Sequence, residues 1–477
     1  MKNKIRNSIV IAAILFTGIT EAQIITQIFP FTFASGNAPT GSLVLKGGKF
    51  FGMTSYGGLG HGSGGIVFSI DTNGSNEKTL LNFNDTMGSS PYGSLIISKN
   101  KLYGMTSAGG TNFWINSNYN HGCIFTIDTT GKNYKELHYF TGSGNTDGLA
   151  PHGSLLLLGA KLYGMTSAGG NLATGSSGCI FSIDTNGSGY KIVYTFRYNL
   201  ITHDTDGSTP YGSLIYNSGQ FFGMASSGGR YDSGCVFSID TNGSNYKRLI
   251  DFEGKGINGK SPNGDLVYAF GKLYGMTELG GANYCGTIFS LNTNGSSFNS
   301  VDFSYQSFPN HGAKPMGSLS VFGSNLYGMT FWGSNTNNYG NIFSISSNLF
   351  TFAMVYDFSS FSRPEGSLLI SGDHFYGMTN LGGSHGGGVI FGYDTTLIST
   401  SNQPIKTSHF TIYPSPFVTD FNVVLDQPAT VTLYDILGHQ VYRQVLPTGN
   451  DLVSPGSVPT GIYFINVDGI CKKIIKE

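Results

Sequence analysis

The stretch PHGSLLLLGAKLYGMTS (residues 151–167), followed by GCIFSIDTNG (residues 178–187), decides the fold. Its Gly-Met core recurs at intervals of 49 to 60 residues, at Met53, Met105, Met165, Met224, Met276, Met329 and Met378. A Leu stands ten residues before each Met, at the end of an element of the form Pro-x-Gly-Ser-Leu. Repetition at such a period is typical of architectures built from one stacked supersecondary unit. We number these units repeats 1 to 7.

Each repeat carries the pattern of four short strands, which we call a to d. Strand a follows Pro-x-Gly-Ser, strand b holds Tyr-Gly-Met-Thr, strand c holds Ile-Phe-x-Ile-Asp, and strand d ends in Phe. Asn-Gly between c and d is a strong turn signal. No helical periodicity is present, so the pattern predicts an all-β, seven-bladed β-propeller. Repeat 7 lacks strand d, whereas a strand-like run stands at 25–33. We therefore predict that the N-terminal strand closes the last blade. The glycine of Tyr-Gly-Met-Thr is predicted to permit close contact between blades.

The composition narrows the class of protein. The chain has 70 Gly, 35 Phe and 27 Tyr, only 11% charged residues and a formal net charge of -1. Such an aromatic content is too apolar for a disordered chain. The near-zero net charge and the lack of basic runs exclude a positively charged surface of the kind that binds nucleic acid.

The N-terminus predicts export. Basic residues precede an apolar run at 9–19 and a small residue, Ala22, so we expect a signal peptide at 1–22 and no transmembrane segment in the mature chain. Three of the five cysteines occupy equivalent positions in strand c, namely Cys123, Cys179 and Cys235. We interpret them as small buried residues rather than disulfide partners or metal ligands.

Loop lengths indicate which face carries function. The a-to-b and c-to-d connections are nearly uniform, whereas the d-to-a and b-to-c connections vary and lie on the other face. Insertions in repeat proteins gather on the binding face. The b-to-c loops hold the candidate stacking residues Phe113, Trp114, Tyr119, Phe331, Trp332 and Tyr339. Such rings suit sugars or peptides, and the alternative is that the loops pack on themselves.

The variable residue of Pro-x-Gly-Ser-Leu is a second candidate. It should form a ring at the channel mouth, with surface exposure alone as the alternative. The seven residues are Thr40, Tyr92, His152, Tyr211, Asn263, Met316 and Glu365.

We predict no metal site, no cofactor and no assigned catalytic residue. Asn145-Thr146-Asp147-Gly148 and Asp204-Thr205-Asp206-Gly207 look superficially like calcium loops but lack the closing Glu. Nucleophile and phosphate-loop motifs are absent from the sequence. A carboxylate pair across the channel, drawn from Asp147, Asp206 or Glu365, is the enzymatic alternative.

The repeats stop near a linker at 399–408, and a separate domain follows at 409–477. Strands are predicted at 410–413, 421–425, 429–434, 440–445, 462–467 and 472–476, with turns that favour a small antiparallel sandwich. The domain resembles the type A C-terminal sorting domain of the type 9 secretion system of Gram-negative bacteria. The residues that carry this resemblance are Tyr413, Pro414, Pro416, Tyr434, Asp435, Gly438, Gly461, Tyr463, Lys472 and Lys473. Ser415 departs from the family's usual Asn.

The repeats at 23–398 resemble the GloVer tandem repeat of exported proteins, a family from which no reaction carries over. Together the two resemblances imply passage through the type 9 translocon by means of residues 409–477, and then release or attachment to the outer-membrane surface. We therefore expect a secreted or surface binding or adhesion module with a glycan or protein ligand, most plausibly a glycan. The alternatives are a polysaccharide lyase or glycoside hydrolase and a structural matrix component.

Overall fold

The computed structural model describes residues 25–59, 64–84, 86–110, 121–142, 147–170, 177–197, 205–254, 258–303, 312–333, 339–359, 361–395, 410–414, 416–425, 428–435, 440–467 and 470–477. The predicted signal peptide lies outside these ranges. The described residues contain strands and turns but no helix. The chain divides into two compact units, Met1–Thr395 and Thr396–Glu477.

The four predicted strands of a repeat form one antiparallel sheet. In repeat 3, β12 (Lys161–Thr166) lies between β11 (Leu156–Leu158) and β14 (Cys179–Asp184), and β15 (Lys191–Thr195) pairs with the far side of β14. The turn between β14 and β15 places Gly187 at φ +92°. It is closed by a hydrogen bond of 2.8 Å from Gly187 N to the Asp184 carbonyl. Only glycine adopts this backbone conformation without strain, which explains the Asn-Gly signal.

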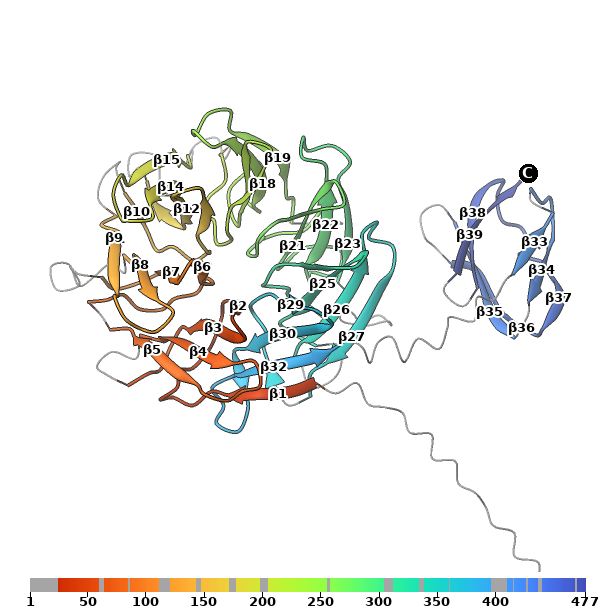
Figure 1. Cartoon of the computed structure of the whole chain (residues 1–477). Coiled ribbons are helices and arrows are strands. Elements are labelled where there is room, and N and C mark those ends of the chain that lie inside the picture. The colour runs from red at the N-terminus through yellow and green to blue at the C-terminus, as the bar shows by residue number, and fades with distance from the viewer. Residues whose placement is uncertain are drawn as a thin grey trace, which may run out of the picture. The chain divides into compact units, whose positions relative to one another are not determined.

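Among its described residues, the first unit holds seven such sheets, which follow one another around a common centre (Figure 1). The other six are β2-β3-β4-β5 (Val44–Lys46, Lys49–Thr54, Ile66–Asp71, Lys78–Asn82), β6-β7-β8-β9 (Ile96–Ser98, Lys101–Thr106, Cys123–Asp128, Lys135–Tyr139), β16-β17-β18-β19 (Ile215–Asn217, Gln220–Ala225, Cys235–Asp240, Lys247–Asp251), β20-β21-β22-β23 (Val267–Ala269, Lys272–Thr277, Thr287–Leu291, Asn299–Asp302), β24-β25-β26-β27 (Ser320–Phe322, Asn325–Thr330, Asn341–Ser346, Phe352–Asp357) and β29-β30-β32-β1 (Leu369–Ser371, His374–Thr379, Val389–Asp394, Ile25–Pro30).

The last sheet joins the two ends of the repeat region. Its outer strand is β1, which pairs antiparallel with β32 from Ile25 opposite Tyr393 to Pro30 opposite Val389, with a bulge between Gln27 and Phe29. The N-terminal run thus occupies the position that strand d takes in the other repeats.

The hydrophobic core lies between successive sheets. Tyr103, Met105 and Ile124 of repeat 2 pack in one buried cluster with Phe181 and Ile183 of repeat 3. The Phe that ends each strand d also contacts the strand-c Phe of the next repeat, with ring centroids 5.2–5.4 Å apart. The seven pairs are Phe83–Phe125, Phe140–Phe181, Phe196–Phe237, Phe252–Phe289, Phe303–Phe343, Phe358–Phe391 and Phe31–Phe68.

The glycine of Tyr-Gly-Met-Thr does not serve the predicted contact between blades. A Cβ at Gly164 would lie 2.5 Å from Cζ of Phe181, its cross-strand neighbour in the same sheet. The equivalent distance in all seven repeats is 2.4–2.7 Å. The glycine therefore makes room for a phenyl ring that covers it within one sheet.

Cys123, Cys179 and Cys235 are free thiols with no exposed surface, as the sequence predicted. Burial raises the pKa of each thiol to about 12. At neutral pH these groups are protonated and behave as small apolar side chains.

The d-to-a and b-to-c connections of each repeat lie side by side. They pair as two-stranded ladders in repeat 3, between β10 (Gly148–Leu149) and β13 (Ala168–Gly169), and in repeat 7, between β28 (Phe361–Ser362) and β31 (Leu381–Gly382). The other five repeats have an isolated bridge at the same place: Asn37–Tyr56, Ser89–Ala108, Ser208–Ser227, Lys260–Leu279 and Ala313–Trp332. The two variable connections therefore share one face, as their lengths predicted.

The second unit is a small antiparallel sandwich of a three-stranded and a four-stranded sheet. The first sheet is β33-β34-β37 (Thr411–Tyr413, Phe421–Leu425, Gly449–Val453), and the second is β36-β35-β38-β39 (Gln440–Leu446, Ala429–Tyr434, Gly461–Val467, Ile470–Lys476). Its core includes Phe417, Val431 and Ile465, none of which is exposed. Six strands agree with the prediction, and β37 was missed because its sequence GNDLV resembles a turn.

Candidate functional site

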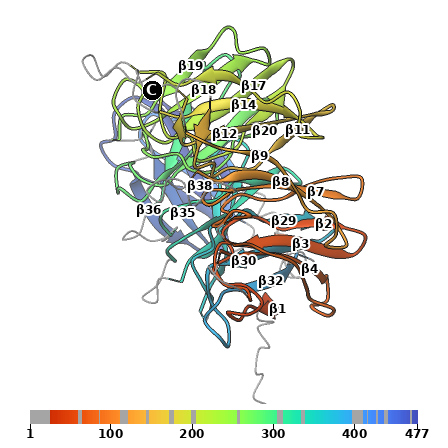
Figure 2. The same ribbon diagram turned by 90° about the vertical axis from the view of Figure 1, so that its left-hand side faces the viewer.

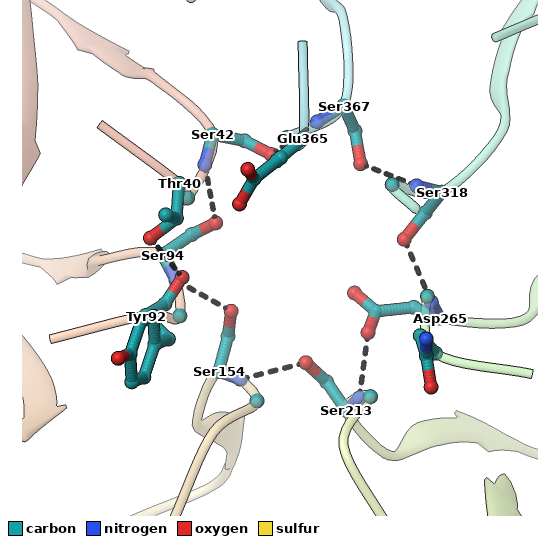
Figure 3. Close-up of a pocket in the computed structure, with 18 of the residues that line it drawn as sticks. Thr40, Ser42, Tyr92, Ser94, Ser154, Ser213, Asp265, Ser318, Glu365 and Ser367 are labelled. Atoms are coloured by element: carbon teal, nitrogen blue, oxygen red, sulfur yellow. Dashed lines mark hydrogen bonds between the residues drawn. The ribbon is translucent and has the colours of Figure 1, made fainter. Parts of the chain in front are cut away.

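The Pro-x-Gly-Ser elements meet at the centre of the first unit, where their last residues form a ring of hydrogen bonds (Figure 3). In every repeat the backbone N–H of this residue donates to the side-chain oxygen of its counterpart in the next repeat, at 2.6–2.9 Å. The ring runs through Ser42, Ser94, Ser154, Ser213, Asp265, Ser318 and Ser367, and then back to Ser42. Repeat 5 departs from the motif by placing Asp265 where the others have Ser.

The preceding glycine is the residue that permits close approach between repeats. A Cβ at Gly153 would lie 2.2 Å from the carbonyl oxygen of Gly212 in the next repeat. The corresponding distance is 2.2–2.4 Å at all seven positions, including from Gly366 of repeat 7 to Gly41 of repeat 1. Since these neighbours are backbone atoms, no flexible side chain can yield to a larger residue.

The variable residues of the motif surround this ring. They and the Gly-Ser residues of all seven repeats line one cavity of about 90 Å³, which we call the mouth. Sequence reasoning placed these seven residues together, but it did not foresee the ring of hydrogen bonds that holds them.

One side of the mouth is aromatic. The Tyr92 and His152 rings stack with centroids 4.9 Å apart and planes inclined by 13°, and Tyr211 meets His152 edge to face at 4.6 Å. Burial lowers the pKa of His152 to about 4, so its imidazole is neutral at neutral pH. Tyr211 keeps 36% of its surface exposed. This side therefore offers uncharged ring surfaces to a ligand.

The other side is polar and charged. Asn263 donates from Nδ2 to Oε2 of Glu278 at 2.7 Å, while its Oδ1 is buried without a hydrogen-bond partner. Lys314 Nζ lies 3.8 Å from Oε1 of Glu278 and 4.4 Å from the centre of a Trp332 ring. An ammonium over an indole face is held by the ring's quadrupole. These contacts link Asn263 of the mouth to Trp332 through Glu278 and Lys314.

Glu365 lies between the two sides. Its Oε1 accepts a hydrogen bond from Nδ2 of Asn380 at 3.0 Å, and its carboxylate projects over the opening of the ring in Figure 3. Burial raises the pKa of Glu365 to about 7, and the nearby charge of Glu278 adds to the effect against the opposing influence of Arg363. The Arg363 guanidinium lies 5.2 Å from the centre of the Phe331 ring. A carboxyl group that is partly protonated at neutral pH can donate as well as accept a hydrogen bond.

The two sides differ because of one position that sequence reasoning overlooked, the residue after the Thr of strand b. In repeats 1 to 4 it is a Ser whose hydroxyl donates to a carbonyl of the d-to-a connection at 2.7–2.9 Å, namely Ser55, Ser107, Ser167 and Ser226. In repeats 5 to 7 it is Glu278, Phe331 and Asn380. Glu278 and Asn380 reach the mouth, where they form hydrogen bonds with Asn263 and Glu365. Aligning the repeats at this position would have revealed them.

The other predicted candidates are not all brought together. Phe113, Trp114 and Tyr119 lie outside the described residues. Trp332 is 37% exposed beside the mouth, and Tyr339 is half-buried and does not line the cavity.

The two carboxylates proposed for catalysis with Glu365 do not line the mouth either. Asp147 is buried, and it accepts hydrogen bonds from Thr141 N at 2.7 Å and Nε2 of His138 at 3.1 Å. Although burial opposes it, these bonds hold the pKa of Asp147 below its usual value. Asp206 accepts a hydrogen bond from the Tyr194 hydroxyl at 2.7 Å. Both carboxylates thus tie strand d to the following connection.

The sorting residues belong to the second unit. The Tyr463 hydroxyl donates to the Pro459 carbonyl at 2.6 Å, and Tyr413 and Gly461 begin or end strands of its two sheets. Ser415, Gly438 and the side chains of Lys472 and Lys473 lie outside what the structure describes.

In the described part of the chain, no three His, Cys, Asp or Glu side chains are grouped so as to hold a metal ion. Among the same residues, no helix is long and apolar enough to cross a membrane.

Comparison with known families agrees with the repeat pattern. The Gloeobacter/Verrucomicrobia repeat matches residues 14–177, 115–254 and 173–391. The chain belongs to the Gloeobacter/Verrucomicrobia repeat family. The C-terminal unit of this repeat protein matches the secretion system C-terminal sorting domain over residues 411–477. That domain marks a protein of Bacteroidetes-type Gram-negative bacteria that is secreted or attached to the outer-membrane surface.

No curated protein matches this repeat-family chain. Solved structures similar to it include a GH74 xyloglucanase from Xanthomonas campestris (10% identity, 85% of this chain, 60% of that chain, TM-score 0.47). Another is a chain of a nidogen/laminin complex (14% identity, 63% of this chain, 93% of that chain, TM-score 0.38). A third is TolB from Acinetobacter baumannii (15% identity, 63% of this chain, 61% of that chain, TM-score 0.34). Likenesses this distant carry no conclusion about activity.

Proposed function

We propose that the chain is an exported, seven-bladed β-propeller that binds an extracellular glycan at the mouth, without turning it over. The observation that carries this proposal is that the variable residue of all seven repeats lines a single cavity. The ring of seven hydrogen bonds holds the backbone around this cavity, whereas the side chain of the variable residue differs from repeat to repeat.

Closure of the propeller is supported by three contacts between the ends of the repeat region. β1 pairs with β32, Ser367 N donates to Ser42 Oγ at 2.8 Å, and Phe31 meets Phe68 at 5.2 Å. Contacts of the same kinds are found elsewhere in the first unit, and here they join repeat 7 to repeat 1. A closed propeller leaves no open sheet edge between its first and last blades.

The chemistry of the mouth favours a glycan. Sugars present C–H faces that pack on aromatic rings and hydroxyl groups that need both donors and acceptors. Tyr211 and Trp332 offer partly exposed rings, while the Glu365 carboxyl offers a hydrogen-bonding group. A protein ligand remains the second class of partner for the same surfaces.

Delivery follows from the domain order we propose. A signal peptide at 1–22 directs export, the propeller spans 23–398, a linker spans 399–408, and the sorting domain at 409–477 engages the type 9 translocon. The match to the sorting domain at 411–477 supports the last of these boundaries.

An enzymatic role is the second candidate, favoured by one observation. Glu365 has a pKa of about 7, which suits a general acid acting near neutral pH. Hydrolysis or elimination in a polysaccharide would need a second group beside it, and neither Asp147 nor Asp206 lines the cavity.

The test is a binding and turnover screen of the full chain against soluble polysaccharides, with and without chelator. We expect saturable binding that Tyr211→Ala and Trp332→Ala each weaken about tenfold, the loss of roughly one stacking contact. Phe350→Ala, which changes a ring that is 73% exposed in a c-to-d turn, is the matched control and should bind normally. Unchanged binding in both mouth variants would refute the site. New reducing or unsaturated ends, lost in Glu365→Gln, would establish the enzyme instead.

A further inference from the structure

A second and larger cavity lies at the opposite ends of the strands from the mouth. It has a volume of about 660 Å³ and lies between repeats 2 and 3, where the a-to-b hairpins and c-to-d turns of both repeats face each other. Figure 2 shows β2, β7 and β11 reaching toward this same side of the first unit. Its volume lies within the range of cavities that enclose small ligands, roughly 300–1,000 Å³, whereas the mouth, at about 90 Å³, can hold only part of a ligand that lies over it.

The preceding pair of repeats has a side-chain bridge at the equivalent place. Between repeats 1 and 2, Lys46 crosses the gap and donates from Nζ to Oδ1 of Asn100 at 3.2 Å. The equivalent positions between repeats 2 and 3 are Ser98, which is too short to cross, and Ala160, which offers no side-chain acceptor. The bridge between Lys46 and Asn100 therefore has no counterpart between repeats 2 and 3, where the strand-d residue Lys135 instead donates from Nζ to the Asn186 carbonyl at 2.6 Å.

The walls of this cavity carry a net positive charge. In repeats 1 and 3 the first residue of strand b, Lys49 or Lys161, forms an ion pair with the last residue of strand c. In repeat 2, Lys101 stands opposite Asp128 in register, but no ion pair joins these two described residues. Asp128 instead accepts a hydrogen bond from Nδ2 of Asn133 at 2.6 Å. With Lys99 also in the lining, two ammonium groups and one carboxylate give the lining a net charge of +1.

The remaining lining suits a ligand rich in hydroxyl groups. The two turns contribute Thr129, Thr130, Thr185 and Asn186, whose side chains are hydroxyls and an amide, and Tyr103 forms a buried wall. We propose that this cavity is a second binding site, separate from the mouth, for a monosaccharide-sized sugar acid. The sugar's carboxylate binds the ammonium groups of Lys99 and Lys101, and its hydroxyls bind the turn residues.

The experiment is calorimetric titration of the full chain with glucuronate, with glucose as the uncharged comparison. We expect saturable binding of glucuronate that weakens as salt is added, because the pairing is between accessible charges. Lys101→Gln should weaken it about tenfold, the loss expected for one charge-assisted hydrogen bond. Ser98→Lys combined with Ala160→Asn should also abolish it by rebuilding the bridge of the preceding repeats.

Two controls separate this site from the mouth. Lys49→Gln removes the equivalent but ion-paired lysine of repeat 1, and Tyr211→Ala alters the mouth; neither should change glucuronate binding. The proposal is overturned if glucose binds equally well, if Lys101→Gln has no effect, or if no glucuronate binds at millimolar concentration. Loss of binding in Tyr211→Ala alone would assign the sugar acid to the mouth and equally overturn the second site.

Discussion

Gly153→Ala is predicted to destabilise the first unit by disturbing the innermost contact between repeats 3 and 4. The new methyl group would lie 2.2 Å from the Gly212 carbonyl oxygen and 2.6 Å from its carbon, so the backbones must separate by about 1 Å to reach ordinary contact. Overpacking of this kind costs about 1–3 kcal/mol. The separation also weakens the 2.7 Å hydrogen bond from Ser154 N to Ser213 Oγ, which contributes about 1 kcal/mol.

Together these terms give a loss of about 3 kcal/mol, or a fall of roughly 5 °C in Tm for a domain of this size. The assay is thermal unfolding followed by circular dichroism and calorimetry. Gly159→Ala is the comparison variant, because nothing lies within 4 Å of a Cβ there, although Gly159, unlike Gly153, has a positive φ of +64°. It should cost about 1 kcal/mol, from backbone strain alone. Equal destabilisation by the two variants would refute the ring of close backbone contacts.

Three further predictions test other parts of the account. If the N-terminal strand is the fourth strand of the last sheet, Phe31→Ala should lower the free energy of unfolding by about 3–5 kcal/mol. Phe140→Ala, at the equivalent position of repeat 2, should lower it by a similar amount. A much smaller loss in Phe31→Ala would contradict this closure. Burial raises the pKa of Glu365 to about 7, so the folded state holds a proton that the unfolded state releases. Stability should therefore fall as pH rises from about 4.5 to about 7, and denaturation at several pH values should show a smaller fall in Glu365→Gln. Burial raises the pKa of the strand-c thiols of Cys123, Cys179 and Cys235 to about 12, so they should react with a thiol reagent only in denaturant. Rapid reaction of these thiols in the native protein would show that they are accessible.

The sheets were predictable because a local signal was repeated seven times. The Asn-Gly turn and the apolar motifs of strands b and c appear in several copies, so one ambiguous copy did not disturb the pattern. The strand β37 shows the limit: it occurs once, and Gly449 and Asn450 resemble a turn more than a strand. Its pairing with β34 depends on tertiary contacts that no local pattern reports.

The site was predictable in position but not in detail. Counting from strand a placed Tyr92, His152 and Glu365 at one end of the inner strands. An alignment of the repeats at the position after the Thr of strand b would have identified Glu278 and Asn380, but their partners depend on contacts between side chains, such as Lys314 with Glu278. The role of the Tyr-Gly-Met-Thr glycine was wrong for a related reason, since the sequence cannot tell which neighbour occupies the space that a glycine leaves.

The measurement that tests the central claim most directly is a crystal structure of the full chain with an oligosaccharide that the binding screen identifies. The account predicts electron density for a sugar at the mouth, with a ring against Tyr211 or Trp332 and a hydroxyl group within hydrogen-bond distance of the Glu365 carboxyl. Density for the sugar only on another surface of the first unit, with the mouth unoccupied at saturating concentration, would contradict it.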